Sequence, residues 1–383
     1  MSEVWNDVVD TPCLVYDESI LLRDLRAARR IADNAGALLL FSLKACYVRA
    51  IVERITGFVD GFSCSSPYET RFAAELAQSA HLIHLTSPAL TSDELTELQN
   101  SATHISLNSL SQWKLYQSRF SPSVSYGLRL NPQQSFVADQ RYDPCRRYSH
   151  LGVSAADLHR AFSTDRPSLR RLQGLHFHTN CDAVDFGQLK TALEAVLDVA
   201  ASLMPQIKWL NLGGGYLVTG TIRESEFAET ARHAAKDGMT LIFEPGSALV
   251  DDSGSLVTTV LDVVQSDGKT VAIVDSSVNH LADILDFDYH PRISGADADG
   301  AYEVIVVGRS CLAGDVFGVY RFDRPITPGM RLTFIEVGAY SLSKATMFNG
   351  LALPSVCLRS EAGEIRELAR YEYEDFRRIA GDR

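Results

Sequence analysis

A regular alternation of short apolar runs and amphipathic segments constrains the fold of this chain more than any other feature of its sequence. Each apolar run is rich in β-forming residues and ends in Gly, Ser, Asn or Pro, and the segments between runs carry apolar residues at helical spacing. The first five runs start about 21 to 23 residues apart. There are eight such runs: 38–45, 61–66, 83–89, 104–109, 125–131, 174–179, 208–215 and 240–246.

Eight strand–helix units predict an α/β fold, a (β/α)8 TIM-like barrel. A doubly wound parallel sheet is the structural alternative, but such a sheet usually has fewer strands before its topological break. A polar insertion at 132–151 interrupts the rhythm at the C-terminal end of the fifth strand. Because that end of the strands carries function in such barrels, we expect the insertion to lie at the functional face.

After residue 246 the pattern changes to strands joined by tight turns. Runs 256–264 and 270–274 flank a turn at 266–268 and predict a hairpin. These features predict a C-terminal all-β domain, to which the short run 13–16 adds a strand. We therefore expect a barrel at 20–246 and a β domain built from 1–19 and 247–383.

Composition and charge exclude several classes of protein. With 46% hydrophobic and 22% charged residues among 383, the chain can bury a core, which excludes a disordered class. Its formal net charge of −12 disfavours nucleic acid and anionic membranes as partners, because both require basic patches. Seven cysteines without a Cys-x-x-Cys pair indicate reduced thiols. With no signal peptide and no apolar run near the roughly 18 residues of a membrane span, we expect a cytoplasmic protein.

Lys44 and a histidine pair fall at the C-terminal ends of predicted barrel strands, where side chains reach the mouth. Burial would lower the pKa of Lys44 and make its amine nucleophilic, although a lysine at a strand end also commonly extends to solvent. His176 and His178 share a face, which fits metal ligation, contact with a cofactor or a hydrogen-bonded pair. A metal site needs further His and Asp ligands, but the other strand ends carry Lys44, Arg129 and Glu244, so we expect no metal.

Gly213, Gly214 and Gly215 follow the seventh strand, and Glu244 ends the eighth. Three glycines allow backbone N–H groups to surround an anion, and phosphate sites cluster there in barrels, although tight turns also use glycines. A buried Glu244 requires a cationic partner, either a cofactor or a barrel arginine such as Arg129. A lysine, a histidine, phosphate-type glycines and a carboxylate on one face together suit pyridoxal 5′-phosphate.

The order and spacing of short motifs carry a resemblance over nearly the whole chain. They include residues 42–45 (SLKA), 109–113 (SLSQW), 127–132 (GLRLNP), 174–178 (GLHFH), 210–215 (LNLGGG), 244–246 (EPG), 311–316 (CLAGDV) and 348–350 (FNG). The chain resembles the fold type III (alanine racemase-fold) pyridoxal-phosphate-dependent decarboxylases, and within them the group acting on carboxynorspermidine and carboxyspermidine. The resemblance implies a lyase of polyamine (spermidine) biosynthesis, with pyridoxal 5′-phosphate as cofactor, that works as a homodimer with shared active sites.

The resemblance also implies roles for the residues on the cofactor side. Lys44 would form the Schiff base with the cofactor, and His178 would stack on the pyridine ring. Glu244 would pair with the ring nitrogen. A carboxylate there favours the protonated, electron-accepting ring, whereas racemases of this fold have an arginine, so Glu244 implies decarboxylation. The other cofactor-binding residues implied are Gly213, Gly214, Gly215 and Tyr340 at the phosphate, and Arg129.

Residues of the β domain are expected to complete the site of the neighbouring subunit. Cys311 would be the catalytic thiol that reprotonates the product carbon, with the freed Lys44 as the alternative donor. Asp315, together with Asp283 or Asp286, would face amines of the substrate.

Some positions depart from the family's pattern, which leaves two alternatives open. The departures are Arg146, Arg147, Ser247 and Asp288. They fit a paralogous decarboxylase that acts on another amino acid in secondary metabolism. The second alternative is a non-catalytic barrel that binds pyridoxal phosphate, which the large β domain disfavours because such proteins are usually single barrels.

Overall fold

The computed structural model describes residues 10–184, 186–201, 206–217, 224–234, 238–287 and 289–381. The chain divides into two compact units. Asp24–Leu249 form the first, and Met1–Arg23 together with Val250–Arg383 form the second.

Eight parallel strands close the first unit into a barrel. They follow the order β5-β4-β3-β2-β10-β9-β8-β6, and β6 pairs back with β5 to complete the circle. The two-residue strand β7 (Val153–Ser154) attaches to β6. The eight are β2 (Ala37–Ser42), β3 (Gly61–Cys64), β4 (Leu82–Thr86), β5 (His104–Leu107), β6 (Ser125–Asn131), β8 (Leu172–Phe177), β9 (Trp209–Asn211) and β10 (Thr240–Phe243). The predicted eight-unit barrel is therefore confirmed.

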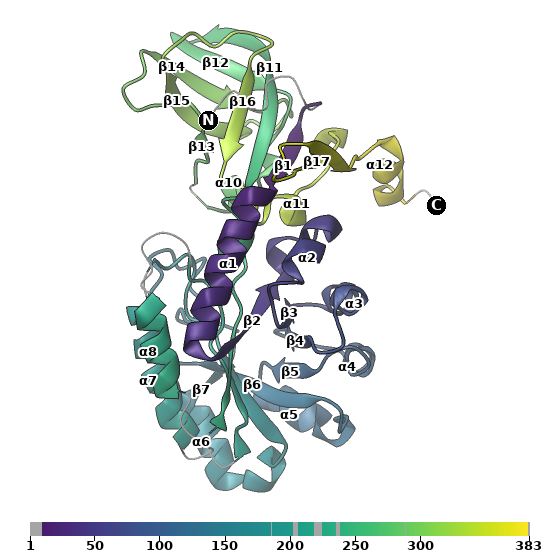
Figure 1. The fold of residues 1–383 in the computed structure, drawn as a ribbon, viewed down its shortest axis with the longest axis vertical. Helices are drawn as coiled ribbons and strands as arrows, with labels where there is room; N and C mark the ends of the chain where they lie inside the picture. Colours follow the sequence, from purple (N-terminus) through teal and green to yellow (C-terminus); the bar gives the residue numbers. More distant parts are fainter. Residues whose placement is uncertain are drawn as a thin grey trace. The chain divides into compact units, whose positions relative to one another are not determined.

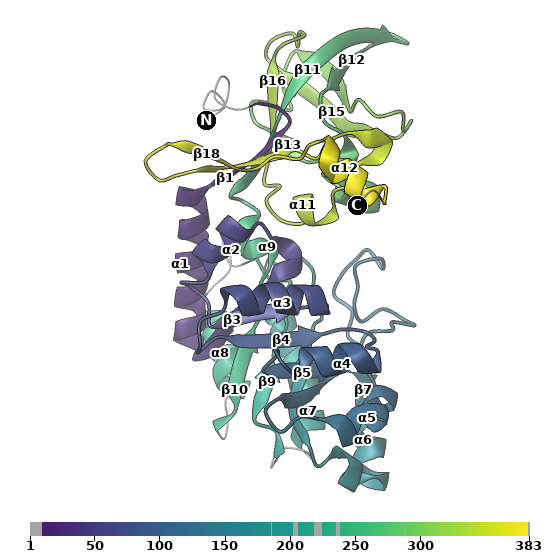
Figure 2. The same cartoon turned by 90° about the vertical axis from the view of Figure 1, so that its right-hand side faces the viewer.

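Helices alternate with these strands along the chain and stand on their outer side (Figures 1 and 2). They are α1 (Glu18–Ala35), α2 (Arg49–Ile55), α3 (Pro67–Leu76), α4 (Ser92–Leu98), α5 (Leu110–Tyr116), α6 (Ala155–Thr164), α7 (Gly187–Ala201), α8 (Glu224–Ala234) and α9 (Ser247–Val250). Several start on a hydroxyl that accepts the N–H of the third helical residue: Ser66 for α3, Thr91 for α4, Ser109 for α5 and Ser154 for α6. These N-caps explain why short polar loops after the strands lead directly into helices.

Trp209 fills the interior of the barrel on β9. It is 3% exposed and packs in one cluster with Leu40 and Ile242. Its indole N–H donates to the hydroxyl of Ser125 at 2.8 Å. A Cβ on Gly174 would lie only 1.9 Å from the indole ring. The glycine in β8 thus leaves the space that the large side chain needs.

The second unit is built on a nine-stranded sheet. Its main path is β15-β14-β12-β11-β1-β17-β18, and β16 pairs with both β11 and β13. The strands are β1 (Cys13–Asp17), β11 (Gly254–Ser266), β12 (Lys269–Val274), β13 (Arg292–Ile293), β14 (Tyr302–Val307), β15 (Val316–Phe322), β16 (Arg331–Ile335), β17 (Ser355–Arg359) and β18 (Ile365–Ala369). The hairpin β11–β12 and the added N-terminal strand β1 are both as predicted.

Short helices accompany this sheet: α10 (Asp283–Asp286), α11 (Ser341–Lys344) and α12 (Tyr373–Ile379). They lie in connections between strands, which the strand pattern of the sequence does not predict.

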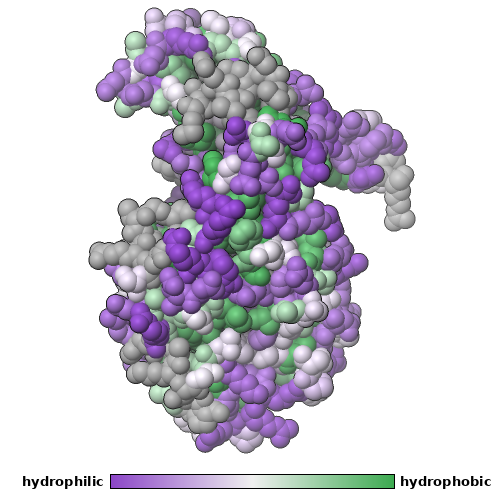
Figure 3. Space-filling model, in the orientation of Figure 1, coloured by the Kyte–Doolittle hydropathy of each residue, from purple (hydrophilic) through white to green (hydrophobic). Residues whose placement is uncertain are grey.

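Hydrophilic residues are spread widely over the face of the molecule drawn in Figure 3, with apolar residues scattered among them. Among the described residues, no helix is both long and apolar enough to cross a membrane.

Candidate active site

The mouth of the barrel gathers the residues that the sequence placed at strand ends. Lys44 lies in the 3-10 turn Leu43–Ala45 directly after β2, and Arg129 lies within β6. His178 follows β8 and Glu244 follows β10. The apolar run predicts a first strand that extends through Lys44, but the strand ends at Ser42. The turn closes there because the N–H of Cys46 donates back to the carbonyl oxygen of Leu43.

The amine of Lys44 is accessible but poorly hydrated. Its side chain is exposed to solvent, while the surrounding mouth of the barrel reduces its hydration. This desolvation and the positive charge of Arg129 lower the pKa of Lys44, against the opposing effect of Glu244 and Glu69. Burial also lowers the pKa of Arg129, to about 10. Lys44 therefore has the character of a nucleophilic amine.

The triglycine segment after β9 forms a tight turn that is tied to His178. Gly213 and Gly215 have φ values of +70° and +84°, which favour glycine. A Cβ on Gly215 would lie 2.0 Å from the carbonyl oxygen of Asn180. The N–H of Gly214 donates to Nδ1 of His178 at 3.1 Å. This bond fixes the tautomer of a neutral His178 with its proton on Nε2.

Glu244 is 6% exposed and lies in a network of hydrogen bonds inside the barrel. Its Oε1 lies 2.5 Å from Nδ1 of His84 and 2.6 Å from Nδ2 of Asn211, which donates to it. Burial alone raises the pKa of Glu244. The charge and hydrogen bond of His84, with hydrogen bonds from Asn211 and Ser63, outweigh burial and lower it. Glu244 is thus held as a buried carboxylate.

Sequence reasoning missed His84 and Asn211. It considered only histidines at the C-terminal ends of strands, whereas His84 lies in the middle of β4, between the apolar residues Ile83 and Leu85. The available signal was a polar side chain at an inward position of an apolar strand, which requires a buried partner. Only closure of the barrel shows that the partner is Glu244, because their strands are not adjacent in the sheet.

His176 is buried like Glu244, and its Nε2 lacks a hydrogen-bond partner. This nitrogen lies 3.8 Å from Oε2 of Glu244. Burial, with the positive charge of Arg129 and others, lowers the pKa of His176 well below its ordinary value. In the part of the chain that the structure describes, no group of three or more His, Cys, Asp or Glu residues is arranged to hold a metal ion.

The second unit carries the acidic candidates around a single lysine. Nζ of Lys344 donates to Asp283 at 2.6 Å and to Asp286 at 2.7 Å. The same ammonium lies 5.1 Å from the ring centre of Phe287 and 5.8 Å from that of Tyr340. Tyr340 itself adopts a left-handed backbone, with φ of +56°. Two carboxylates and two aromatic faces thus surround one ammonium group.

Cys311 and Asp315 belong to one loop but have different surroundings. The Cys311 thiol is exposed, and its backbone N–H donates to Oδ1 of Asn349 at 2.7 Å. Asp315 is only 3% exposed, and its two carboxylate oxygens accept the N–H groups of Val278 and Ser310 at 2.8 and 2.9 Å. Asp315 therefore shapes the loop that presents Cys311.

The departures from the family's pattern lie in different settings. Arg146 and Arg147 are exposed in the insertion after β6, where Arg147 stacks on Tyr148. Ser247 begins α9. Asp288 lies outside the described residues.

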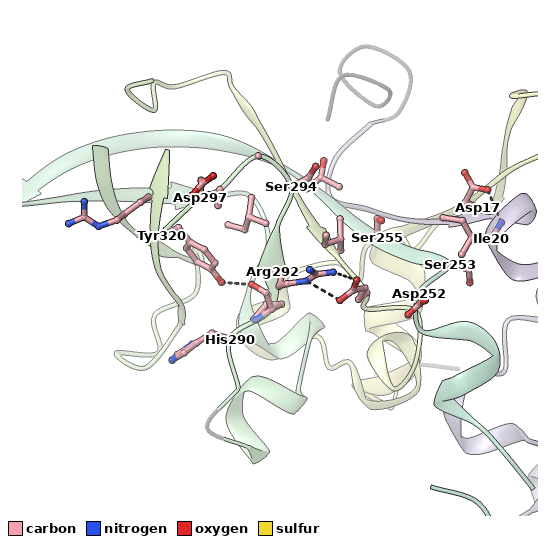
Figure 4. Close-up of a pocket in the computed structure, with 18 of the residues that line it drawn as sticks. Asp17, Ile20, Asp252, Ser253, Ser255, His290, Arg292, Ser294, Asp297 and Tyr320 are labelled. Carbon is pink, nitrogen blue, oxygen red and sulfur yellow. Dashed lines mark hydrogen bonds and ion pairs between the residues drawn. The ribbon is translucent and has the colours of Figure 1, made fainter. Parts of the chain in front are cut away.

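A cavity of about 840 Å³ also lies within the second unit (Figure 4). Its charged groups pair with one another: Arg23 with Asp252, Arg292 with Glu336, and Arg359 with Asp17. Tyr320 donates to the carbonyl oxygen of Pro291 at 2.8 Å. Most of the charged side chains that line this cavity are therefore neutralised by ion pairs with one another.

Comparison with known proteins decides the family. Residues 21–251 match the model of the pyridoxal binding domain of pyridoxal-dependent decarboxylases. This chain belongs to the pyridoxal-dependent decarboxylases. Carboxynorspermidine/carboxyspermidine decarboxylase of Campylobacter jejuni is 31% identical, over 96% of this chain and 98% of its own. Carboxyaminopropylagmatine decarboxylase of a Synechocystis species is 34% identical, over 97% and 95%.

A solved structure agrees with this assignment. The crystal structure of the Campylobacter jejuni carboxynorspermidine decarboxylase, complexed with norspermidine, superimposes with a TM-score of 0.85 at 29% identity. The match covers 96% of this chain and 99% of that one. The decarboxylase described here therefore shares the two-part architecture of its relatives along nearly the whole chain.

The mouth of the barrel fits the cofactor of this family, pyridoxal phosphate. The turn at 213–215 excludes side chains, the orphaned Nε2 of His176 leaves a buried polar atom unsatisfied, and Lys44 offers an accessible amine of lowered pKa. Glu244 supplies a buried carboxylate of lowered pKa. Together these groups have the chemistry needed to hold a phosphate, an aldehyde and a ring nitrogen.

Proposed function

We propose that this decarboxylase removes the α-carboxylate of a carboxylated polyamine, carboxynorspermidine or carboxyspermidine, in the cytoplasm. The observation that carries the proposal is near-full-length similarity to a relative named for these substrates. The acidic cluster of the second unit supports it, because a carboxylated polyamine carries extra ammonium groups that require carboxylate partners. Asp283 and Asp286 are the residues proposed to contact those amines.

The charge of this cluster suits a cationic substrate. Asp283 and Asp286 already hold one ammonium group, that of Lys344, between them. Phe287 and Tyr340 present aromatic faces beside this cluster, and aromatic faces also attract ammonium groups. Asp315 is assigned to the loop of Cys311 instead, because both of its oxygens already accept backbone N–H groups.

At the barrel mouth, each residue has a task in the proposed reaction. Pyridoxal phosphate, when bound, supplies an electron-accepting ring that stabilises negative charge on the α-carbon of the substrate. Lys44 would hold the cofactor covalently, and His178 would lie against its ring. Glu244 would keep the ring nitrogen protonated, which increases the capacity of the ring to accept electrons. The turn at 213–215 would hold the phosphate, a role proposed for Tyr340 as well, and Arg129 would lie on the cofactor side.

Proton return to the product carbon requires an acid at the site. Cys311 is the proposed donor, because its thiol is exposed on a loop held by Asp315 and Asn349. We further propose a homodimer in which this loop completes the site of the neighbouring subunit. Lys44, freed when the product forms, is the alternative donor.

A second candidate substrate is carboxyaminopropylagmatine, favoured by the 34% identity to its decarboxylase. It shares a carboxylated aminopropyl group with the first candidate, but it ends in a guanidinium group. CO₂ release from purified protein loaded with pyridoxal phosphate distinguishes them. The panel contains carboxynorspermidine, carboxyspermidine, carboxyaminopropylagmatine, meso-diaminopimelate and ornithine.

We expect kcat/KM for carboxynorspermidine or carboxyspermidine to exceed that for diaminopimelate and ornithine by about a hundredfold or more. Preference for carboxyaminopropylagmatine would transfer the assignment to the second candidate. Preference for diaminopimelate or ornithine, or no release from any compound, would overturn the proposal.

A further inference from the structure

A buried pair of side chains, His84 and Glu244, lies beneath the mouth of the barrel. His84 is on β4 and fully buried, and Nδ1 lies 2.5 Å from Oε1 of Glu244. Two lone pairs at that distance repel unless a proton lies between them. The geometry therefore requires one proton between the imidazole and the carboxylate.

Asn211 fixes the orientation of this pair. Its Oδ1 accepts the N–H of Gly213 at 2.9 Å, so its amide nitrogen must face the opposite way. That nitrogen donates to Oε1 of Glu244 at 2.6 Å. Since Asn211 contributes hydrogen-bond donors only on that side, it cannot take the shared proton, which stays with His84 and Glu244.

The other nitrogen of the imidazole is also used. Nε2 of His84 lies 2.8 Å from the hydroxyl of Ser106 on β5, and this contact holds the plane of the ring. A hydroxyl both donates and accepts, so Ser106 tolerates a neutral or a charged imidazole. Nδ1 of His84 faces both Oε1 of Glu244 and Nδ2 of Asn211, which lies 2.7 Å away. Since the amide nitrogen only donates, a proton on Nδ1 is directed at Oε1. Oε1 then receives two donors, and Oε2 is the oxygen that remains 3.8 Å from His176.

We propose that His84 is a positioning residue of this decarboxylase: it holds Glu244 through Oε1 as an ionised carboxylate, ready to pair with the protonated ring nitrogen of pyridoxal phosphate. This inference rests on the role proposed for Glu244. It extends that role to a side chain on β4 that does not itself touch the reacting atoms. Without His84, a carboxylate buried this deeply takes up a proton more readily and loses its attraction for the ring.

Other charged or titratable groups act on this pair, and the test must account for them. Each comes from a different strand or strand end: Lys44 after β2, Cys64 on β3, His104 on β5, Arg129 on β6 and His176 on β8. Burial lowers the pKa of the basic groups among them and raises that of the Cys64 thiol. They are left unchanged in every variant below, so any difference in pH dependence comes from the side chain at position 84.

Three substitutions separate positioning from packing. His84→Phe removes both nitrogens at similar size, His84→Asn retains an amide N–H near the place of Nδ1, and His84→Gln retains one near Nε2. The readouts are the dissociation constant of pyridoxal phosphate for the apoenzyme and the pH titration of the absorbance of the bound cofactor. Thermal unfolding of each apoenzyme reports on packing.

We expect His84→Phe and His84→Gln to weaken cofactor binding by about tenfold or more and to shift the absorbance titration. His84→Asn should stay within about threefold of the wild type, because it still donates to Oε1. In a Glu244→Gln background, His84→Phe should have no further effect on cofactor affinity.

The inference would be overturned if all three variants kept the cofactor affinity and absorbance titration of the wild type. It would also be overturned if all three lost cofactor affinity to the same extent. Should His84→Phe fail to fold, the comparison of His84→Asn with His84→Gln still decides the question. Failure of the proposed substrate assignment is seen separately, in the CO₂ panel, because the wild-type protein would still bind its cofactor.

Discussion

At the scale of single residues, the same side-chain type has different roles according to its surroundings. Lys44 is accessible and has a lowered pKa because the barrel mouth desolvates it and Arg129 repels its charge. Lys344 is paired with two aspartates, and its pKa is raised because hydrogen bonds and charge from Asp283 and Asp286 outweigh burial. The first is suited to act as a nucleophile, and the second is suited to remain a cation.

Substitution of Lys44 tests the covalent role proposed for it. Lys44→Ala should abolish the absorption band of the lysine-bound cofactor and reduce kcat by about a thousandfold or more, because no other amine of lowered pKa is assigned at the site. Absorption spectra of the loaded protein and CO₂ release provide the measurement. Lys114→Ala, an exposed lysine of α5, is the matched control. A normal band in Lys44→Ala would refute the assignment.

Substitution of Asp283 tests the amine subsite. Asp283→Asn should raise KM for the carboxylated polyamine by about tenfold with a smaller change in kcat, because it removes a charge that contacts the substrate far from the reacting carbon. Steady-state kinetics measure both constants. Asp262→Asn, an exposed acid on β11, serves as the control. An unchanged KM would show that the cluster around Lys344 binds no part of the substrate.

At the scale of elements, neighbouring barrel strands pack together because the sizes of their side chains are complementary. Gly174 on β8 leaves room for Trp209 on β9, and Ser125 on β6 binds the indole N–H. Such complementarity across neighbouring strands is invisible along the sequence, where glycine in a strand indicates only weak propensity. The rhythm of apolar runs predicted eight strands correctly, because strand formation depends on local pattern.

Crowding at Gly174 gives a test of this packing. Gly174→Ala should lower the free energy of unfolding by about 1–3 kcal/mol, because the new methyl group overlaps the indole of Trp209. Urea unfolding followed by tryptophan fluorescence measures the change. Gly57→Ala is the matched control, since a Cβ there would meet no atom within 4 Å. Equal stability of Gly174→Ala and wild type would contradict the packing described.

At the scale of the whole molecule, histidines that are partly or fully shielded from water make the fold sensitive to acid. Burial and the charge of His84 lower the pKa of His104 to about 4, from an ordinary value of 6.5. Burial likewise lowers the pKa of His280, in the second unit, to about 4. The unfolded chain takes up these protons at higher pH than the folded one, so stability is complete above pH 6.5 and falls as pH decreases towards 4.

The contribution of His104 can be isolated. His104→Gln should reduce the loss of unfolding free energy between pH 7 and pH 5 by about 1–2 kcal/mol, because glutamine does not titrate. Urea titrations at the two pH values measure it. His159→Gln, an exposed histidine of α6, should leave the pH dependence unchanged. If the unfolding free energy of His104→Gln had the same pH dependence as that of the wild type, His104 would not be a source of the acid sensitivity.

The proposed homodimer is tested by mixing inactive variants. Lys44→Ala and Cys311→Ala should each be impaired, and refolding them together should restore up to about a quarter of wild-type activity if each site draws Lys44 and Cys311 from different subunits. Gel filtration reports the size of the assembly. A fully active monomer, or no restoration in mixed dimers, would show that the Cys311 loop does not complete a neighbouring site.

The barrel, the β unit and the polar residues at the strand ends can all be predicted from the sequence. It could do so because apolar periodicity and strand-end polarity are local properties of the chain. The connection between His84 and Glu244 spans 160 residues, and the burial of Asp315 against Val278 and Ser310 also joins separate segments. These pairings become visible only in the folded chain, because an isolated polar residue in a sequence does not specify which distant group will satisfy it when water is removed.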